Sequence, residues 1–176
     1  MALVCEGMRG RMLRRRAAIG LGCGMLAAPA ARATEAPRPT LVVSGRIGAP
    51  DPGSTERRFS LEALEALGMA EFTTVTPWTP NPRRFSGVPL RKLLEAVRAQ
   101  GRELHVTALN DYRSVIPVAD GVAAGALLAT RMEGSPIRIR DFGPVWIVFP
   151  WSDRPELDRP ALHHYAVWQL ARIEVR

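Results

Sequence analysis

The segment FSGVPLRKLL, residues 85–94, decides much of the fold of this chain. Its leucines begin an apolar stripe whose members recur at intervals of three and four residues, a spacing typical of a helix that packs one side against a core. Gly101 ends the pattern, so we expect a helix over residues 90–100. The stripe consists of Leu90, Leu93, Leu94 and Val97.

On both sides of this helix the sequence alternates between short helical and short β-prone segments. A helix is expected over residues 61–67, capped by Ser60 and ended by Gly68, and an Ala-rich helix over residues 122–130. Short helices interspersed with a larger number of strands predict a single α+β domain with a mixed β-sheet. The expected strands are residues 40–45, 71–75, 105–108, 113–117, 137–140, 145–149 and 171–175.

The composition is that of one globular domain. The 176 residues include 24 Lys and Arg against 17 Asp and Glu, a net charge of +7, and 47% of them are hydrophobic. Residues 1–33 hold six basic groups and one acidic group, so residues 34–176 carry a net charge of only +2. Because the basic excess lies in this leader, the domain has no electrostatic footprint for nucleic acid, and we expect no nucleic-acid partner.

The leader has the features of an export signal. Arginines lie within residues 9–16, an apolar stretch follows at residues 17–30, and Ala31-Arg32-Ala33 has the small-x-small pattern that signal peptidase cuts. Arg14-Arg15-Arg16 leaves both the twin-arginine and the Sec route open, and either route would take the protein to the periplasm. The expected organisation is a signal peptide over residues 1–33, a linker over residues 34–39 and a domain over residues 40–176.

Residue types that usually carry chemistry are scarce. Both cysteines, Cys5 and Cys23, lie in the leader, so the mature domain would have no disulfide, thiolate ligand or cysteine nucleophile. The sequence contains no nucleophile elbow, zinc-protease motif, P-loop or dinucleotide fingerprint. Ser152, Asp153 and His163 have no spacing that supports a hydrolase triad, and we expect no catalytic residue and no metal site.

Aromatic and polar residues gather instead in three expected loops, at residues 76–78, 110–112 and 140–144. An indole near carboxylates suits a flat heteroaromatic ligand that stacks on one face and donates hydrogen bonds from its edge. A pterin is such a ligand, because one carboxylate can accept from both its 2-amino group and its N3–H. The candidate ligand-binding residues are Thr76, Trp78, Asn110, Asp111, Tyr112, Arg140 and Asp141.

Each of these features also has a purely structural interpretation. Trp78 can be a core residue, since large aromatic side chains are mostly buried. Asn110-Asp111 and Asp141-Phe142-Gly143 can be ordinary turns that bind their own backbone. Trp146 and Trp168 lie within apolar strand patterns, and we expect both in the core.

From about Thr40 to Val175 the chain resembles the molybdopterin-binding domain of sulfite-oxidase-type oxidoreductases. The resemblance implies the fold of that domain and a pterin cofactor, with molybdopterin as one form. The segments that carry it are residues 85–94, Ala108-Leu109-Asn110-Asp111-Tyr112, residues 128–134, Asp141-Phe142-Gly143-Pro144-Val145-Trp146 and Val167-Trp168-Gln169-Leu170.

Two departures from the family pattern bear on the cofactor. The resemblance implies a molybdenum-ligating cysteine shortly before the helix at Leu90, but here that stretch is Thr73-Thr74-Val75-Thr76-Pro77-Trp78. A threonine hydroxyl is a far poorer ligand than a thiolate for high-valent molybdenum. The family also has an arginine near the cofactor phosphate, and Trp146 stands at that position. Both departures favour a pterin pocket without molybdenum.

The resemblance extends to small exported members of the family, some of which are similar to periplasmic pterin-binding regulators. It implies a pterin sensor or carrier whose partner is an inner-membrane signalling protein with a periplasmic domain. In such a protein Trp78 would stack on the ring, Asp111 or Asp141 would accept from its edge, and Asn110 and Tyr112 would fix its orientation. Two alternatives stay open: a molybdopterin-dependent oxidoreductase, and an interaction module with a vestigial pocket.

Overall fold

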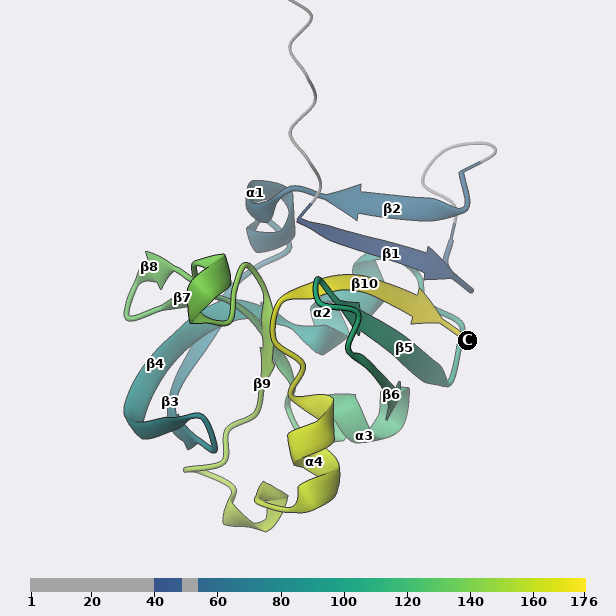
Figure 1. Cartoon of the computed structure of the whole chain (residues 1–176). Helices are drawn as coiled ribbons and strands as arrows, with labels where there is room; N and C mark the ends of the chain where they lie inside the picture. The colour runs from purple at the N-terminus through teal and green to yellow at the C-terminus, as the bar shows by residue number, and fades with distance from the viewer. Residues whose placement is uncertain (1–39, 49–53) are drawn as a thin grey trace, which may run out of the picture. The chain divides into compact units, whose positions relative to one another are not determined.

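Two β-sheets frame the protein in the computed structural model, which describes residues 40–48 and 54–176 (Figure 1). The strands are β1 (Leu41–Gly45), β2 (Glu56–Phe59), β3 (Ala70–Thr76), β4 (Thr79–Pro89), β5 (Glu103–Ala108), β6 (Arg113–Pro117), β7 (Leu127–Met132), β8 (Ser135–Pro136), β9 (Trp146–Val148) and β10 (Leu170–Val175). The helices are α1 (Leu61–Glu65), α2 (Leu90–Ala96), α3 (Val118–Ala123) and α4 (Pro160–Tyr165), with 3₁₀ turns η1 (Ile139–Asp141) and η2 (Pro155–Leu157).

The first sheet has the strand order β2-β1-β10-β5-β6, and the second has the order β3-β4-β7-β8 with β9 also paired to β7. Strand β1 runs parallel to β10, whereas the other pairings are antiparallel. A mixed sheet combined with short helices confirms the predicted α+β class. At the lower end of Figure 1, α4 and the chain around η2 lie near the β3–β4 hairpin.

The core contains the inward-facing residues that the sequence pattern predicted. All four members of the apolar stripe of α2 are buried, which confirms the helix at Leu90, although it ends at Ala96. Strand β5 alternates in the same way, with Leu104, Val106 and Ala108 buried and the residues between them more accessible. Ser60 caps α1 as expected, because its side chain accepts a hydrogen bond from the Ala63 amide at 3.1 Å.

The predicted Ala-rich helix over residues 122–130 is wrong. Helix α3 ends at Ala123, and Gly125 follows it with a left-handed φ of +72° that turns the chain out of the helix. The residues from Leu127 to Thr130 are all buried in β7, which is paired with both β4 and β9. A strand covered on both faces has no polar alternation, so its apolar run resembles a buried helix in sequence.

The predicted strand over residues 137–140 is also wrong, because this segment turns into η1. Only Ile137 is buried there, and Asp141 folds back to pair with Arg138. Strands β2 and β4 and helix α4 were not predicted. Most residues of β2 are charged, so it lacks the apolar pattern of a strand. Pro80 and Pro82 in the exposed half of β4 argue against a strand in sequence, and α4 is only 6 residues long.

Glu65 ties helix α1 to strand β7. Its Oε1 accepts hydrogen bonds from Thr130 Oγ1 at 2.7 Å and Arg131 Nε at 2.9 Å, and its Oε2 accepts from Arg131 Nη2 at 2.9 Å. The hydrogen bonds from Arg131, followed by that from Thr130, lower the pKa of Glu65 despite its partial burial. The ionised form of Glu65 therefore stabilises the fold.

Replacing Glu65 by glutamine is expected to lower the free energy of unfolding by about 1–2 kcal/mol at neutral pH. Because the folded-state pKa is depressed, this contribution is present above the unfolded pKa and is lost as pH falls through the folded pKa. Urea denaturation at several pH values should show the two proteins converging well below about pH 4. The control is Glu95→Gln, whose exposed pair with Arg91 should contribute under about 0.5 kcal/mol. An equal effect of both changes would contradict this role of Glu65.

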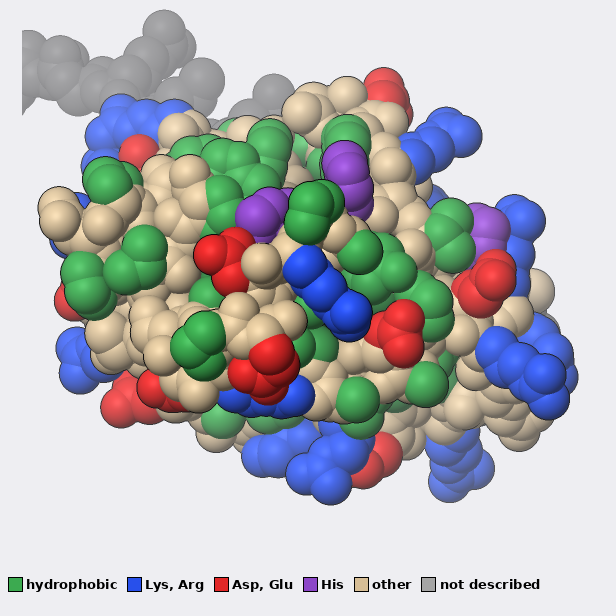
Figure 2. Space-filling model, turned by 90° about the horizontal axis from the view of Figure 1, so that it is seen from below, with side chains coloured by type: hydrophobic (Ala, Val, Ile, Leu, Met, Phe, Trp, Pro, Cys, Tyr) green, Lys and Arg blue, Asp and Glu red, His purple; other side chains and the backbone are tan. Residues whose placement is uncertain are grey.

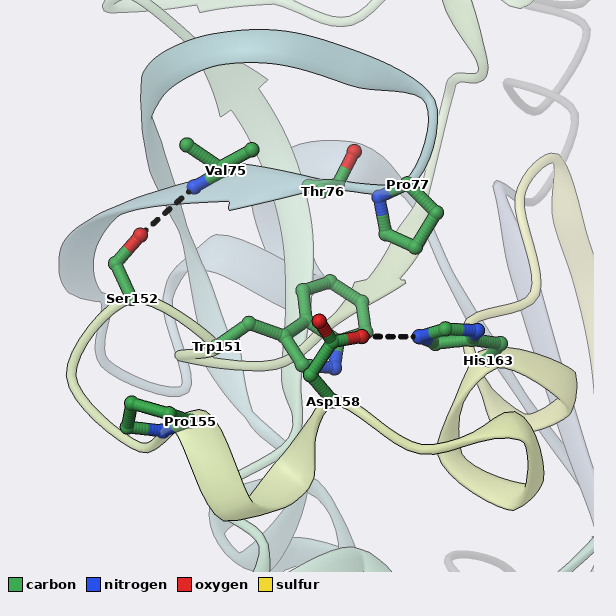
Figure 3. A pocket seen from close by; sticks show the side chains of 8 residues that line it. All are labelled: Val75, Thr76, Pro77, Trp151, Ser152, Pro155, Asp158 and His163. Atoms are coloured by element: carbon green, nitrogen blue, oxygen red, sulfur yellow. Dashed lines mark hydrogen bonds and ion pairs between the residues drawn. The ribbon is translucent and has the colours of Figure 1, made fainter.

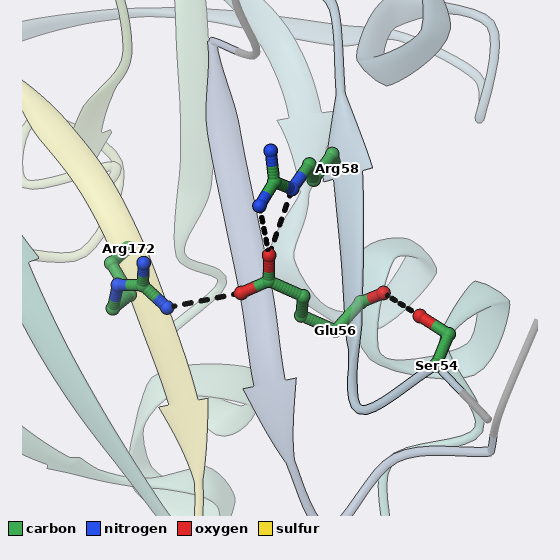
Figure 4. A network of polar contacts seen from close by, with 4 residues as sticks. All are labelled: Ser54, Glu56, Arg58 and Arg172. Atoms are coloured by element: carbon green, nitrogen blue, oxygen red, sulfur yellow. Dashed lines mark hydrogen bonds and ion pairs between the residues drawn. The ribbon is translucent and has the colours of Figure 1, made fainter.

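The outer face of the first sheet carries a second polar network (Figure 4). Glu56 on β2 accepts from Arg58 Nε at 2.8 Å and pairs with Arg172 of β10 at 3.4 Å, across the intervening β1. These partners, Arg58 foremost, hold the pKa of Glu56 below its ordinary value. The network is exposed to solvent, so it contributes little to the stability of the protein.

The predicted signal peptide over residues 1–33 and linker over residues 34–39 lie outside the described residues, as do both cysteines. Within residues 40–48 and 54–176, none of the helices combines the length and the apolar character that crossing a membrane requires.

Candidate functional site

The turn between β3 and β4 presents Trp78 and uses Thr76 to hold its shape. Thr76 Oγ1 accepts hydrogen bonds from the backbone amides of Trp78 at 3.2 Å and Thr79 at 3.0 Å. It also lies 2.8 Å from Thr79 Oγ1, and Thr76 is only 3% exposed. The Thr76 hydroxyl therefore makes its hydrogen bonds inside the turn and fixes the backbone that carries Trp78.

Trp78 lies at the centre of an aromatic cluster. Its ring centroid is 5.2 Å from that of Trp168, 5.9 Å from that of Trp146, 6.4 Å from that of His163 and 6.5 Å from that of Trp151. All four contacts are edge-to-face, and Trp78 is half-buried. Trp78 thus packs against the core and still has accessible surface, which combines the two interpretations of this residue.

Trp168 extends the cluster toward solvent. Its ring is parallel to that of Tyr112, with an angle of 7° between the planes and 6.5 Å between the centroids, and Tyr112 is 44% exposed. Phe142 lies edge-on to Trp168 at 5.8 Å. Trp168 packs against the core but is only half-buried, so the prediction that it is a core residue is wrong in part. Local spacing does not predict the position of Trp168 in this cluster, because its ring partners Trp78, Tyr112 and Phe142 lie on segments that are distant along the chain.

Three loops meet beside this aromatic pair and are joined through Gln169. The Leu109 amide donates to the Gln169 carbonyl at 2.8 Å, and the Gln169 amide donates to the Phe142 carbonyl at 2.9 Å. The Gln169 side chain donates from Nε2 to the Ile139 carbonyl at 2.8 Å. The β5–β6 loop, the η1–β9 loop and the α4–β10 loop are therefore one connected surface.

Each of these three loops contains a non-glycine residue in the left-handed region. The φ angles are +64° at Asp111, +77° at Phe142 and +54° at Gln169. Such a conformation costs about 1–2 kcal/mol per residue and persists only where the surrounding structure imposes it. Two further residues of this kind, Arg98 and Glu133, lie elsewhere, but the other three converge beside Trp168 and make this surface a candidate site.

Of the polar residues predicted to bind ligand, Asn110, Asp111 and Tyr112 lie on the β5–β6 loop, whereas Arg140 and Asp141 lie in η1. Several of them also stabilise their own turns. Asn110 Oδ1 accepts from the Tyr112 amide at 3.2 Å, which is the turn geometry that the alternative interpretation expected. Asp141 accepts from Arg138 Nε at 2.6 Å and lies 3.9 Å from Arg140 Nε. The fold brings Trp78 and Tyr112 into contact with one residue, Trp168, while Thr76 lies at the base of the hairpin turn. The ligand roles of the seven residues stay predictions.

A pocket of about 450 Å³ opens beside the hairpin turn (Figure 3). His163 of α4 lies at one end of it, with Nε2 at 2.7 Å from Asp158 Oδ1. The His163 ring also packs edge-on against Trp151 at 6.2 Å. The lining residues are Val75, Thr76, Pro77, Trp151, Ser152, Pro155, Asp158 and His163.

Ser152 lies at the other end of the pocket and forms hydrogen bonds with residues of β3. Its Oγ accepts from the Val75 amide at 2.9 Å and lies 3.3 Å from Thr74 Oγ1. Neither of these contacts involves His163, and the carboxylate that pairs with His163 is Asp158, not Asp153. In the described residues, Ser152, Asp153 and His163 therefore do not form a hydrolase triad.

Figure 2 views the molecule from the end at which α4 and the β3–β4 hairpin lie. On this face histidine side chains lie among hydrophobic ones, with isolated acidic and basic groups around them.

The family model for the oxidoreductase molybdopterin binding domain matches residues 54–152, more than half of the chain. The chain belongs to this family. The match confirms the resemblance seen in the sequence, and it spans all seven residues predicted to bind ligand. Asp158, His163 and Trp168 lie beyond the matched range. No curated protein matches the chain.

The hairpin turn of this molybdopterin-binding domain does not present a side chain suited to bind a metal. The resemblance puts the metal-binding cysteine in the stretch from Thr73 to Trp78, where the Thr76 oxygen is already engaged by two amides and a hydroxyl. Among the residues that the structure describes, no three histidine, cysteine or carboxylate side chains converge to hold a metal ion. The aromatic rings near the turn do fit a flat ligand ring, because the indoles of Trp78 and Trp168 are only half-buried and the phenol of Tyr112 is exposed beside Trp168.

The same molybdopterin-binding domain has Trp146 where the resemblance implies a phosphate-binding arginine. Trp146 is fully buried between Phe85 and Phe142, as the sequence predicted for a core residue. Its indole N–H has no hydrogen-bond partner among the described residues. A buried indole supplies no positive charge, so this position does not fit an anionic phosphate.

Proposed function

We propose that the protein is a pterin-binding sensor or carrier that does no redox chemistry of its own. The observation that carries the proposal is the hairpin turn, which combines an engaged Thr76 hydroxyl with a half-buried Trp78. A turn of this kind offers a stacking surface for a ring and no free ligand for molybdenum. Membership of the molybdopterin-binding family supports the pterin as the ligand class.

The strained loops support a sensing role. A ligand that contacts Trp78 would act on Trp168, which packs against it, and would favour one arrangement of the three loops that Gln169 connects. A protein partner that contacts those loops would then distinguish the bound form from the free form. In the proposal, residues 1–33 direct export, the protein works in the periplasm, and the partner is a membrane signalling protein with a periplasmic domain.

Titration of the mature domain with a pterin such as neopterin tests this function. We expect binding, and we expect Trp78→Ala to weaken it by roughly 10- to 100-fold, because stacking on one aromatic ring contributes about 1–3 kcal/mol. Asp111→Asn and Asp141→Asn examine the two predicted edge acceptors in the same assay. The control is Val115→Ala, an exposed apolar side chain on β6. Failure of the unaltered domain to bind any pterin would overturn the proposal.

A second candidate function is a molybdopterin-dependent oxidoreductase, which the family match favours equally. Native mass spectrometry of the protein isolated from the periplasm separates the two. A mass increment equal to an unphosphorylated pterin supports the sensor or carrier. An increment equal to a molybdenum cofactor, with stoichiometric molybdenum by elemental analysis, supports the oxidoreductase.

A further inference from the structure

The pocket beside the hairpin lies next to Trp78 but is distinct from the three loops. Its apolar wall is the Trp151 indole, 6% exposed, together with Pro77 and Pro155. Trp151 also packs edge-on against Trp78. In Figure 3 the hairpin residues and the residues of the η2 segment face each other across this space. A slot with one indole wall and two proline rings suits a flat ring.

The pocket has one carboxylate, and it is hydrogen-bonded to a histidine. None of its eight lining residues is a lysine or an arginine, and Asp158 is its only carboxylate. Asp158 Oδ1 is held by His163 Nε2, whereas Oδ2 has no hydrogen-bond partner among the described residues. Ser152 is already engaged with Val75 and Thr74, so the free carboxylate oxygen of the pocket is Asp158 Oδ2, on a side chain that is 66% exposed. Such a pocket disfavours a phosphate and favours a ligand edge that donates N–H groups.

We infer that Asp158, and not a carboxylate of the three loops, accepts hydrogen bonds from the paired N–H donors of the pterin, with His163 as a positioning residue. A carboxylate oxygen has lone pairs to spare after one hydrogen bond, so Asp158 can accept from the 2-amino group and N3–H together. The ring then lies against Trp151. This inference rests on the proposed function and names the recognition residue within it. Asp158 and His163 lie outside residues 54–152, so the family match assigns them nothing.

Binding of two ring systems to matched variants tests the inference. Neopterin has the 2-amino group, and the lumazine with the same 6-trihydroxypropyl side chain carries a carbonyl in its place, so the unaltered protein should prefer neopterin. Asp158→Asn should weaken neopterin binding by roughly 10- to 100-fold and should abolish the preference, because an amide presents one acceptor and one donor. The control is Asp153→Asn, a neighbouring exposed carboxylate that does not line the pocket. Thermal unfolding verifies that both variants fold.

The role of His163 is tested by the ratio of the affinities for neopterin and for the lumazine. His163→Gln retains a side-chain donor for Asp158 and should keep most of the preference for neopterin, whereas His163→Ala should reduce it. If the unaltered protein binds no pterin, the proposed function fails. If it binds neopterin and Asp158→Asn binds it equally well while Asp111→Asn or Asp141→Asn does not, only the assignment to Asp158 is overturned.

Discussion

Replacing Trp146 by alanine should lower the free energy of unfolding by about 4 kcal/mol, as is typical when a fully buried tryptophan is truncated. Trp146 is 0% exposed and contacts the rings of Phe142 at 4.8 Å, Phe85 at 5.4 Å and Trp78 at 5.9 Å. Its loss would remove the packing beneath the hairpin turn as well as core volume. Urea denaturation gives the stability, and neopterin titration gives the effect on the site above it.

Trp146→Phe separates the volume of this side chain from its polar atom. Phenylalanine keeps most of the packing and deletes the indole N–H that has no partner among the described residues. Deleting an unsatisfied buried donor offsets part of the lost volume, so this variant should cost under about 1.5 kcal/mol. Equal losses for the phenylalanine and alanine variants would contradict the view that Trp146 stabilises the protein chiefly by packing.

The parts of the fold that sequence could predict are those in which one face is buried. Strands β5 and β10 alternate, and α2 repeats its leucines, so local periodicity shows which side faces the core. Strand β7 is buried throughout and β2 is largely charged, so neither has the alternation from which a strand is inferred. Those two strands are defined by their neighbours, which local sequence does not contain.

The candidate site was predictable only in part, for the same reason. Trp78 and Tyr112 were assigned from loop position and residue type, and both rings do contact Trp168. Trp168 was predicted to be a core residue, and Asp158 was not assigned. Each becomes part of a site only when the loops between α4 and its neighbours fold against the β3–β4 hairpin, and that contact spans more than 70 residues of sequence. Short-range spacing contains no signal of this kind.

Replacing Gly143 by alanine should cost about 3 kcal/mol of stability and weaken pterin binding together. A Cβ at Gly143 would overlap with the backbone carbonyl of Ile137. Neither side can yield easily: the Ile137 amide donates to the Thr130 carbonyl at 2.9 Å, and the Gly143 amide donates to the Arg138 carbonyl at 2.9 Å. The strain would fall on Phe142, which precedes Gly143 and packs against Trp168. Trp168 packs against Trp78, and Trp78 packs against the Trp151 wall of the pocket, so a shift of Phe142 would reach the bound ring through these contacts.

Gly125→Ala is the matched control for this change. Gly125 also has a special backbone, with a φ of +72°, but the nearest atom to an added Cβ is 3.7 Å away, on the Pro150 ring. Only the left-handed conformation is penalised there, so the cost should be about 1 kcal/mol with unchanged neopterin affinity. Urea denaturation and neopterin titration of both variants give the comparison. Equal stabilities and equal affinities for the two variants would show that the η1–β9 loop can move freely, and would remove the basis for treating the three loops as one rigid surface.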